Sequence, residues 1–191
     1  MNDYCNGIAY ATGCIVTDEG KKYLVVRNLD VWYVDQIAGC TGYNKYKLDT
    51  NIERDGVPCW VVKARNICGL PPLDEIKSWT DFCRAYIEIH GSLDIRREKN
   101  TKGNRINRLR LRIYGRETLL NKMNDILPAK NKKMQYIVST TEGKYIGRTC
   151  ALYYQSRKEI LDILDWIDGA QKNKKIWKKW DETMRKAGEV E

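Results

Sequence analysis

Three arginines alternate with apolar residues in the segment from 108 to 114, which runs Arg-Leu-Arg-Leu-Arg-Ile-Tyr. Successive side chains of a β-strand point to opposite faces, so this spacing predicts Arg108, Arg110 and Arg112 on one face. A guanidinium group carries paired N–H donors that match a phosphate group or the O6 and N7 edge of guanine. The pattern is therefore typical of nucleic-acid contact.

A half-buried sheet with one solvated polar face also alternates, and this is the competing interpretation. Three aligned arginines without interleaved acids are unusual on such a face, because neighbouring like charges repel. A strand predicted over 92–97 adds Arg96, with Ser92 and Asp94 in the same alternation, and a basic loop over 97–105 lies between the two strands. We therefore favour nucleic-acid binding for this face.

Further cations and one tyrosine are predicted to extend the contact surface. The first half of the chain supplies Lys45, Tyr46, Lys47 and Lys63, and the second half adds Lys144 and Arg148 at a predicted hairpin. Because the charge is thinner in the first half, we expect asymmetric contact and a non-palindromic target.

The overall charge agrees with a polyanionic partner. The 191 residues include 34 Lys or Arg and 25 Asp or Glu, a formal net charge of +9. Such an excess favours a polyanionic partner, because counterions released from the polyanion drive binding, and composition alone allows DNA, RNA or an anionic membrane surface. The chain has no uncharged apolar stretch of about 18 residues, so no membrane partner is expected.

The cysteines do not predict a metal site. Seven cysteines lie at irregular spacing beside a single histidine, which gives no zinc-binding pattern. We expect buried free thiols in a reducing compartment, and hence a cytoplasmic protein. The N-terminal segment has no basic region and carries acids, so a secretory signal is not expected either.

Hydrophobic periodicity predicts elements that recur in nearly the same order. In the first half we expect a buried helix over 4–17, a strand over 22–27, a helix over 30–38, and strands over 44–50 and 57–64. In the second half we expect a helix over 78–90, strands over 92–97 and 107–114, a helix over 116–127, strands over 134–140 and 146–155, and a helix over 157–168.

Two short matches support a duplication. KYKLDT at 45–50 lies against QYIVST at 135–140, and GVPC at 56–59 against GRTC at 147–150, at offsets that differ by one residue. We therefore predict two units, 1–72 and 73–169. The segment 170–191 is predicted as a basic amphipathic helix, with Trp177, Trp180 and Met184 on its apolar side. That helix either packs on the body with its lysines in solvent or serves as an extra phosphate-contacting arm.

The predicted elements resemble the αββαββα plan of the LAGLIDADG homing endonucleases. In both, a helix, two strands, a helix, a hairpin and a helix follow one another, and this order occurs twice. The motif of that family is a helix ending in an acid and a glycine, followed by a strand. Residues 82–95, FCRAYIEIHGSLDI, resemble this motif in the second half, and residues 10–23, YATGCIVTDEGKKY, resemble it in the first. The resemblance covers most of residues 4–168.

This resemblance implies an α+β fold of duplicated αββαββα LAGLIDADG-like units, with two saddle-shaped antiparallel sheets packed across a pseudo-twofold helix pair. Small residues let the two motif helices approach closely in that family, and Ala9, Gly13 and Ala85 would do so here. The sheets would lie in the major groove of double-stranded DNA. The duplicated chain would act as a monomer.

The resemblance also implies metal chemistry, because each motif helix of the family delivers one carboxylate to shared divalent ions that cut DNA. In the first motif the catalytic and metal-binding acid would be Asp18 or Glu19, depending on the register. In the second motif His90 stands in the position of the acid, and a neutral imidazole is a poor ligand for Mg²⁺. Glu88 lies about 200° round the helix from His90, so it does not substitute directly.

Two roles for His90 stay open: a general base, or a polar residue at a former active site. We therefore predict a sequence-specific double-stranded DNA-binding protein whose cleavage is lost or weakened, acting as a phage or mobile-element regulator. One alternative is an active homing endonuclease that depends on Mg²⁺; without activity no cofactor is expected. The other alternative is a phage inhibitor or interaction protein that uses the same basic sheet.

Overall fold

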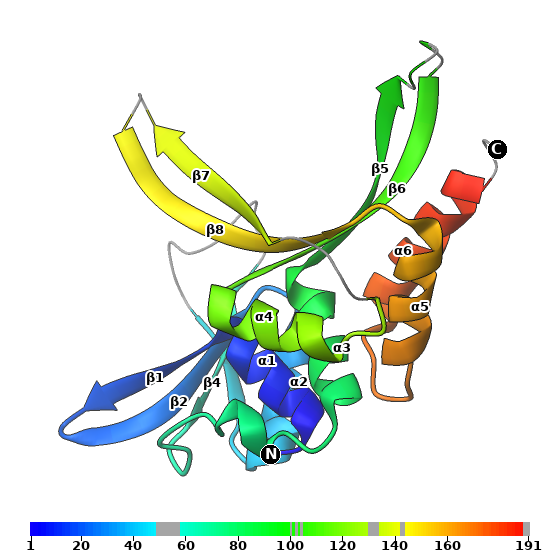
Figure 1. Cartoon of the computed structure of the whole chain (residues 1–191). Helices are drawn as coiled ribbons and strands as arrows, with labels where there is room; N and C mark the ends of the chain where they lie inside the picture. The colour runs from blue at the N-terminus through cyan, green and yellow to red at the C-terminus, as the bar shows by residue number, and fades with distance from the viewer. Residues whose placement is uncertain are drawn as a thin grey trace. The chain divides into compact units, whose positions relative to one another are not determined.

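A computed structural model describes residues 1–48, 58–99, 101, 103, 105–129, 134–141 and 144–188, with the side chains of 105, 137–141 and 144–149 left undescribed. The chain divides into two compact units, Met1–Ile89 and His90–Glu191. Each unit contains one four-stranded antiparallel sheet with helices packed against it (Figure 1). The predicted α+β class with two antiparallel sheets is therefore confirmed.

The first unit contains α1 (Asp3–Thr12), β1 (Gly13–Asp18), β2 (Lys21–Asn28), α2 (Val31–Thr41), β3 (Lys45–Lys47), β4 (Trp60–Ala64), the 3-10 helix η1 (Leu73–Glu75) and α3 (Trp79–His90) up to its penultimate residue. Its strand order is β1-β2-β4-β3. The side chain of Asn2 accepts a hydrogen bond from the Cys5 amide at the start of α1, and Asp30 does the same for Trp32 in α2. These caps fix where both helices begin.

The predicted helix over 4–17 is wrong beyond Thr12. Helix α1 ends there, and the next six residues pair with β2 from Gly13 opposite Val26 to Asp18 opposite Lys21. The apolar run continues across this boundary, so hydrophobicity alone does not mark it. The physical reason is the β-branched series from Ile15 to Thr17, which favours a pleated strand over a helix.

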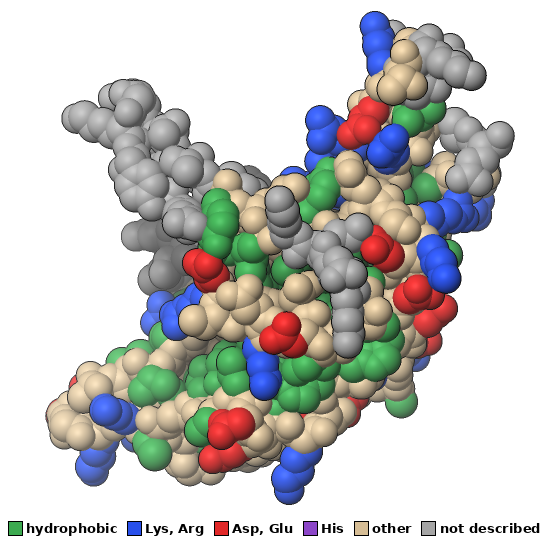
Figure 2. All heavy atoms as spheres, in the orientation of Figure 1, with side chains coloured by type: hydrophobic (Ala, Val, Ile, Leu, Met, Phe, Trp, Pro, Cys, Tyr) green, Lys and Arg blue, Asp and Glu red, His purple; other side chains and the backbone are tan. Residues whose placement is uncertain are grey.

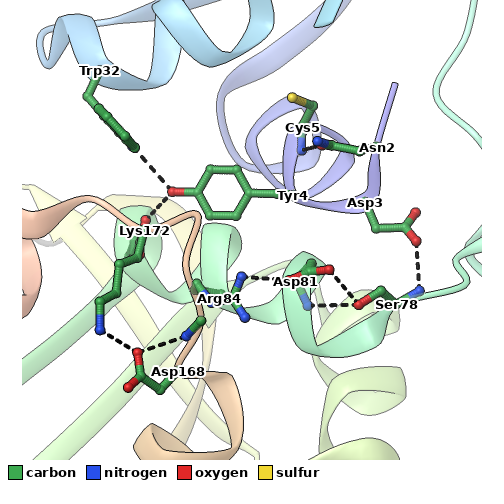
Figure 3. A network of polar contacts seen from close by, with 12 residues as sticks. Asn2, Asp3, Tyr4, Cys5, Trp32, Ser78, Asp81, Arg84, Asp168 and Lys172 are labelled. Atoms are coloured by element: carbon green, nitrogen blue, oxygen red, sulfur yellow. Dashed lines mark hydrogen bonds and ion pairs between the residues drawn. The ribbon is translucent and has the colours of Figure 1, made fainter.

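Helix α3 belongs to the second repeat by sequence, yet it packs within the first unit. A Cβ atom at Gly7 of α1 would overlap the backbone oxygen of Phe82 and lie 2.9 Å from the Cβ of Ala85. Asp3 accepts a hydrogen bond of 2.7 Å from the Ser78 amide at the start of α3 (Figure 3). A small residue is thus required at Gly7, opposite Ala85. Ala85 was predicted from the sequence as a small residue at this helix contact, but Gly7 was not.

A buried polar chain joins the three helices of this unit. The Tyr4 hydroxyl donates a 2.5 Å hydrogen bond to Glu88 and accepts one of 3.3 Å from the indole of Trp32. Burial, followed by the charge of Glu88, raises the pKa of Tyr4 far above its usual value. Glu88 is 4% exposed. Its carboxylate therefore faces the core, away from the surface that a metal would need, in line with the expected 200° rotation from His90.

The second unit contains β5 (Gly91–Lys99), β6 (Arg105–Gly115), α4 (Glu117–Ile126), β7 (Gln135–Thr141), β8 (Lys144–Tyr154), α5 (Arg157–Ile167) and α6 (Lys174–Gly188). Its strand order, β5-β6-β8-β7, repeats that of the first unit. The helices of this unit lie on one side of the curved sheet, over the buried side chains of Leu93, Leu109 and Leu111 (Figure 1). No helix among the described residues packs on the other face of this sheet.

Helix α6 is held against β5 and β6. Trp177 and Trp180 are buried, with ring centroids 5.4 Å apart. The Lys172 ammonium lies 4.4 Å from the Trp177 ring and forms an ion pair with Asp168. The apolar side of this helix therefore faces the protein, and its lysines face solvent.

The prediction of free thiols is wrong for Cys5 and Cys40, which form a disulfide between α1 and α2. The other five cysteines are free; Cys59, Cys83 and Cys150 are buried as expected, whereas Cys14 and Cys68 are exposed. Burial raises the pKa of the Cys83 thiol, which makes it an inert apolar group. Within the described part of the chain, no helix is long and apolar enough to cross a membrane.

Candidate nucleic-acid interface

The helix-free face of the second sheet carries the predicted arginines. Strands β5 and β6 pair so that Arg96 lies opposite Arg108, Asp94 opposite Arg110, and Ser92 opposite Arg112. All four arginines therefore share one face, while Leu109 and Leu111 turn toward the helices, as the alternation predicts.

Acidic side chains lie between these arginines: Asp94, which the predicted alternation places on this face, and Glu98, which lay outside the predicted strand. Asp94 accepts hydrogen bonds from Arg110 at 2.7 Å and 2.9 Å and from Arg112 at 2.7 Å. Glu98 lies 3.1 Å from Arg96 and 3.4 Å from Arg108. Figure 2 shows blue and red side chains side by side along the arm formed by β5 and β6. Cross-strand pairing brings them together, because residues far apart in sequence become neighbours in the ladder.

The Asp94 carboxylate is held in its charged form. Partial burial alone would raise its pKa, but the hydrogen bonds and charges of Arg110 and Arg112 lower the pKa below the usual value. The bond to Asp94 in turn raises the pKa of Arg110. Because this carboxylate holds both guanidinium groups in place, their remaining N–H donors point in fixed directions. Less side-chain entropy is then lost when these donors form a bidentate contact with a ligand.

An open hollow lies beside these arginines on the same face. Its lining includes Arg110, Arg112, Gln135, Tyr153 and Gln155. The Gln155 amide donates a 2.8 Å hydrogen bond to the Tyr153 hydroxyl. Gln135, Tyr153 and Gln155 were not selected from the sequence; the strand alternation of 146–155 could have found Tyr153. Amide, phenol and guanidinium groups on one sheet face are the group types that hydrogen-bond base edges.

In the first unit the structure separates four residues that the sequence analysis grouped. Tyr46 lies opposite Val61, and the Lys63 ammonium is 5.9 Å from the Tyr46 ring, so Tyr46 and Lys63 share the outer face. The side chains of Lys45 and Lys47 belong to the opposite face of the sheet, which is the face toward the helices. Lys45 forms an ion pair with Asp35 of α2. Of these four residues, only Tyr46 and Lys63 are placed for contact through the outer face.

Two further cations of the first unit were missed. Arg27 is exposed and lies opposite Val61, on the same face as Lys63. Arg65 directly follows β4 and lines a shallow hollow with Lys21 and Tyr23. The period of two along 22–27 was sufficient to identify Arg27. Lys144 and Arg148 lie in β8, but their side chains are outside the described part of the structure.

The two candidate acids of the first motif do not lie at a helix end. Asp18 is the last residue of β1, and Glu19 with φ 48° and Gly20 with φ 77° form the exposed turn to β2. A strand of six residues separates Asp18 from the end of α1, which corresponds to roughly 20 Å at 3.3 Å per residue. The placement of Asp18 or Glu19 as the acid at the C-terminal end of the motif helix is therefore wrong.

The residues that do end the motif helices are Thr12, before Gly13, and His90, before Gly91. The Thr12 hydroxyl donates to the backbone oxygen of Ile8 at 3.2 Å. A Cβ at Gly13 would overlap the Ala9 carbonyl oxygen, so glycine is required directly after this helix. Neither a hydroxyl nor an imidazole replaces the hard carboxylate ligand that Mg²⁺ prefers. Among the described residues, no cluster of three His, Cys, Asp or Glu could hold a metal ion. The end residues of these helices do not fit Mg²⁺.

Along the chain, a helix followed directly by glycine and then by the strands of an antiparallel sheet of order 1-2-4-3 occurs twice, and this plan defines a LAGLIDADG-like fold. The I-LtrWI LAGLIDADG homing endonuclease bound to target DNA has a TM-score of 0.65 and 9% identity, covering 98% of this chain and 90% of that chain. The meganuclease I-SmaMI bound to uncleaveable DNA has a TM-score of 0.63 and 8% identity, covering 98% and 89%.

A third solved structure, the N-terminal LAGLIDADG domain of DUF199/WhiA, has a TM-score of 0.52 and 16% identity, and covers 88% of this chain and 82% of that chain. No protein-family model matches the sequence, and no curated protein sequence matches it. The predicted resemblance is confirmed at the level of the fold: the chain has a LAGLIDADG-like fold.

Proposed function

We propose that this chain is a sequence-specific double-stranded DNA-binding protein that has lost DNA cleavage. The observation that carries the proposal is the ordered pair Arg110 and Arg112, both held by Asp94 on a helix-free sheet face. Similar folds include two homing endonucleases whose structures contain DNA. A fixed guanidinium favours bidentate contact with a guanine edge, whereas a free cation contacts any phosphate.

The loss of cleavage rests on the residues that end the two motif helices. Thr12 and His90 stand where the family has carboxylates, and the acids Asp18 and Glu19 belong to a hairpin turn. Chemistry that needs metal-bridging acids has no ligands at those positions. In this proposal His90 is a polar residue at a former active site, and the protein needs no Mg²⁺.

The biological role that suits binding without cleavage is occupancy of a site. We therefore propose a regulator of a phage or mobile element, acting as a monomer because one chain supplies both sheets. The second sheet would make the stronger base contacts through its four arginines. The first sheet would contribute fewer contacts through Arg27, Tyr46 and Lys63, so the target would be non-palindromic.

Selection of bound duplexes from a random library, with and without Mg²⁺, tests this function. We expect one asymmetric sequence to be enriched equally in both conditions, and no cut products on a plasmid carrying it. Arg110→Ala with Arg112→Ala should abolish the enrichment. Lys122→Ala with Lys158→Ala removes the same charge from exposed positions of α4 and α5 and should leave it intact. Enrichment that survives in the arginine variant would refute the assigned surface, and Mg²⁺-dependent cutting would refute the loss of cleavage.

A further inference from the structure

The last helix carries a large share of the net positive charge of the chain. Helix α6, Lys174–Gly188, contains six Lys or Arg and two acids, a net charge of +4 out of +9 for the whole chain. By contrast, the four arginines of the second sheet are offset by Asp94 and Glu98. A group of exposed lysines with no ion pair among the described residues therefore lies on α6, outside the proposed reading face.

Four lysines form this surface: Lys174, Lys175, Lys178 and Lys179. All four are exposed, and none has an ion pair among the described residues. We call them the lysine patch. Lys172 is excluded, because its ion pair with Asp168 and its contact with Trp177 already use it within the fold.

The lysine patch is electrostatically unfavourable for the helix that carries it. Lys174 with Lys178, and Lys175 with Lys179, are like-charged pairs four residues apart, which repel; the acids Asp181 and Glu182 lie at attractive spacing from Lys178 and Lys179 alone. The first turn of α6 holds no acid, so its cations also oppose the positive end of the helix dipole. Trp177 and Trp180 anchor the helix despite this repulsion. Local conflict of this kind within an otherwise consistent fold points to a function.

The patch is on the opposite side of the second unit from the arginines. Helix α6 packs on β5 and β6, on the side of the sheet that carries the other helices of this unit (Figure 1). Sheet and helix together make a layer roughly 20 Å thick. A straight duplex bound to the arginine face would not reach lysines on the far side of that layer.

We propose that the lysine patch holds the phosphate backbone of a second duplex segment, distinct from the one that the sheet binds. Lysine is a mobile point charge that contacts phosphate without base discrimination. The exposed large apolar side chains, Met1, Leu29, Tyr46 and Tyr136, all lie outside α6. A protein interface would need an apolar centre, and a membrane-surface helix would need exposed Trp or Leu, so phosphate is the favoured ligand. The second site goes beyond the proposed function and does not depend on the arginine face.

A bridging assay tests the proposal on the full chain. A duplex carrying the selected site is immobilised, protein is bound, and capture of a second, labelled 20-base-pair duplex of random sequence is measured at low salt. We expect capture by the wild type. The variant K174Q/K175Q/K178Q/K179Q should capture at least tenfold less. It should also melt at the same or a higher temperature, because the repulsion within α6 is removed.

A charge-matched control distinguishes a specific effect of the lysine patch from a general effect of net charge. K47Q/K77Q/K122Q/K158Q removes four exposed lysines elsewhere and should retain bridging. The salt dependence of second-duplex binding should be steeper in the wild type than in the patch variant, by up to about 3.6 in the log–log slope for four phosphate contacts. Equal loss in both variants would mean a general charge effect and would overturn the proposal.

Two further results would overturn the proposal. Sedimentation of the protein–duplex complex establishes that one chain, and not a dimer, bridges the two duplexes; bridging only by dimers would overturn the proposal. Patch-dependent binding to vesicles of phosphatidylserine and phosphatidylcholine in place of duplex would overturn it as well. Arg110→Ala with Arg112→Ala should lose selective binding while keeping the patch-dependent salt slope, so a failure of the proposed function is distinguishable from a failure of this site.

Discussion

The helix-free face of the second sheet and the outer face of the first sheet share a topology but carry different chemistry. Both sheets have the strand order 1-2-4-3. The second sheet places four arginines in a ladder bridged by Asp94 and Glu98, whereas the first has Arg27, Tyr46 and Lys63 beside Val25 and Val61. A backbone plan can therefore be duplicated while the groups that meet a ligand diverge, because outward positions are not constrained by the core.

This difference predicts unequal contributions to binding, and the largest effect belongs to the second sheet. Arg110→Ala with Arg112→Ala should weaken binding to the selected duplex by about 2–6 kcal/mol, since each bidentate base contact is worth about 1–3 kcal/mol. The matched pair on the first sheet, Arg27→Ala with Lys63→Ala, should weaken binding to the same duplex by about tenfold or less. Fluorescence anisotropy titrations at one salt concentration measure both. Equal losses of affinity in the two variants would contradict the predicted asymmetry between the two sheets.

A smaller effect is expected from the carboxylate that orders the arginines. Asp94→Asn should reduce discrimination between selected and random duplexes roughly tenfold, about 1.4 kcal/mol, while binding to random duplex rises as a negative charge is lost. The matched variant is Glu98→Gln, whose contacts at 3.1 Å and 3.4 Å are longer, and it should change discrimination less. If discrimination is unchanged in Asp94→Asn, the arginines do not need Asp94 for positioning.

The same carboxylate gives a pH dependence of stability. Because Arg110 and Arg112 lower the pKa of folded Asp94, its contribution is fully present above its unfolded pKa of about 3.9 and is lost as pH falls through the lower folded pKa. The difference in unfolding free energy between wild type and Asp94→Asn should thus be constant from about pH 7 to about pH 5 and shrink below about pH 4. Urea unfolding across this range measures it. A decrease that is already complete at about pH 6 would show that the carboxyl group is not held charged.

The smallest expected effect concerns the acids of the first hairpin turn. Asp18→Ala with Glu19→Ala should change neither binding to the selected duplex nor the absence of cutting in Mg²⁺, because both residues lie at an exposed turn. Plasmid assays in Mg²⁺ and Mn²⁺ with both proteins give the measurement. Cutting by the wild type that disappears in the double variant would restore the metal-binding role first predicted for these acids.

Much of the fold followed from local patterns. The helices predicted over 78–90, 116–127 and 157–168 and the four strands predicted in the second half of the chain agree with the observed elements within a few residues. Each of these has a clear period and a start signal such as Ser156, whose side chain caps α5. The strand after Thr12 was missed because a continuous apolar run fits a buried helix and a buried strand equally well. That single error moved the first motif by six residues and put Asp18 at a helix end.

The sequence by itself determined which residues alternate, that the elements repeat, and that arginines line one face of β6. Only the tertiary structure decided that Asp94 bonds both Arg110 and Arg112, that Glu98 joins the same face, that Lys45 turns to Asp35 and away from Tyr46, and that the lysines of α6 lie behind the sheet. The physical reason is that alternation and periodicity are properties of single elements, whereas ladder register and helix packing depend on contacts between residues far apart in the chain.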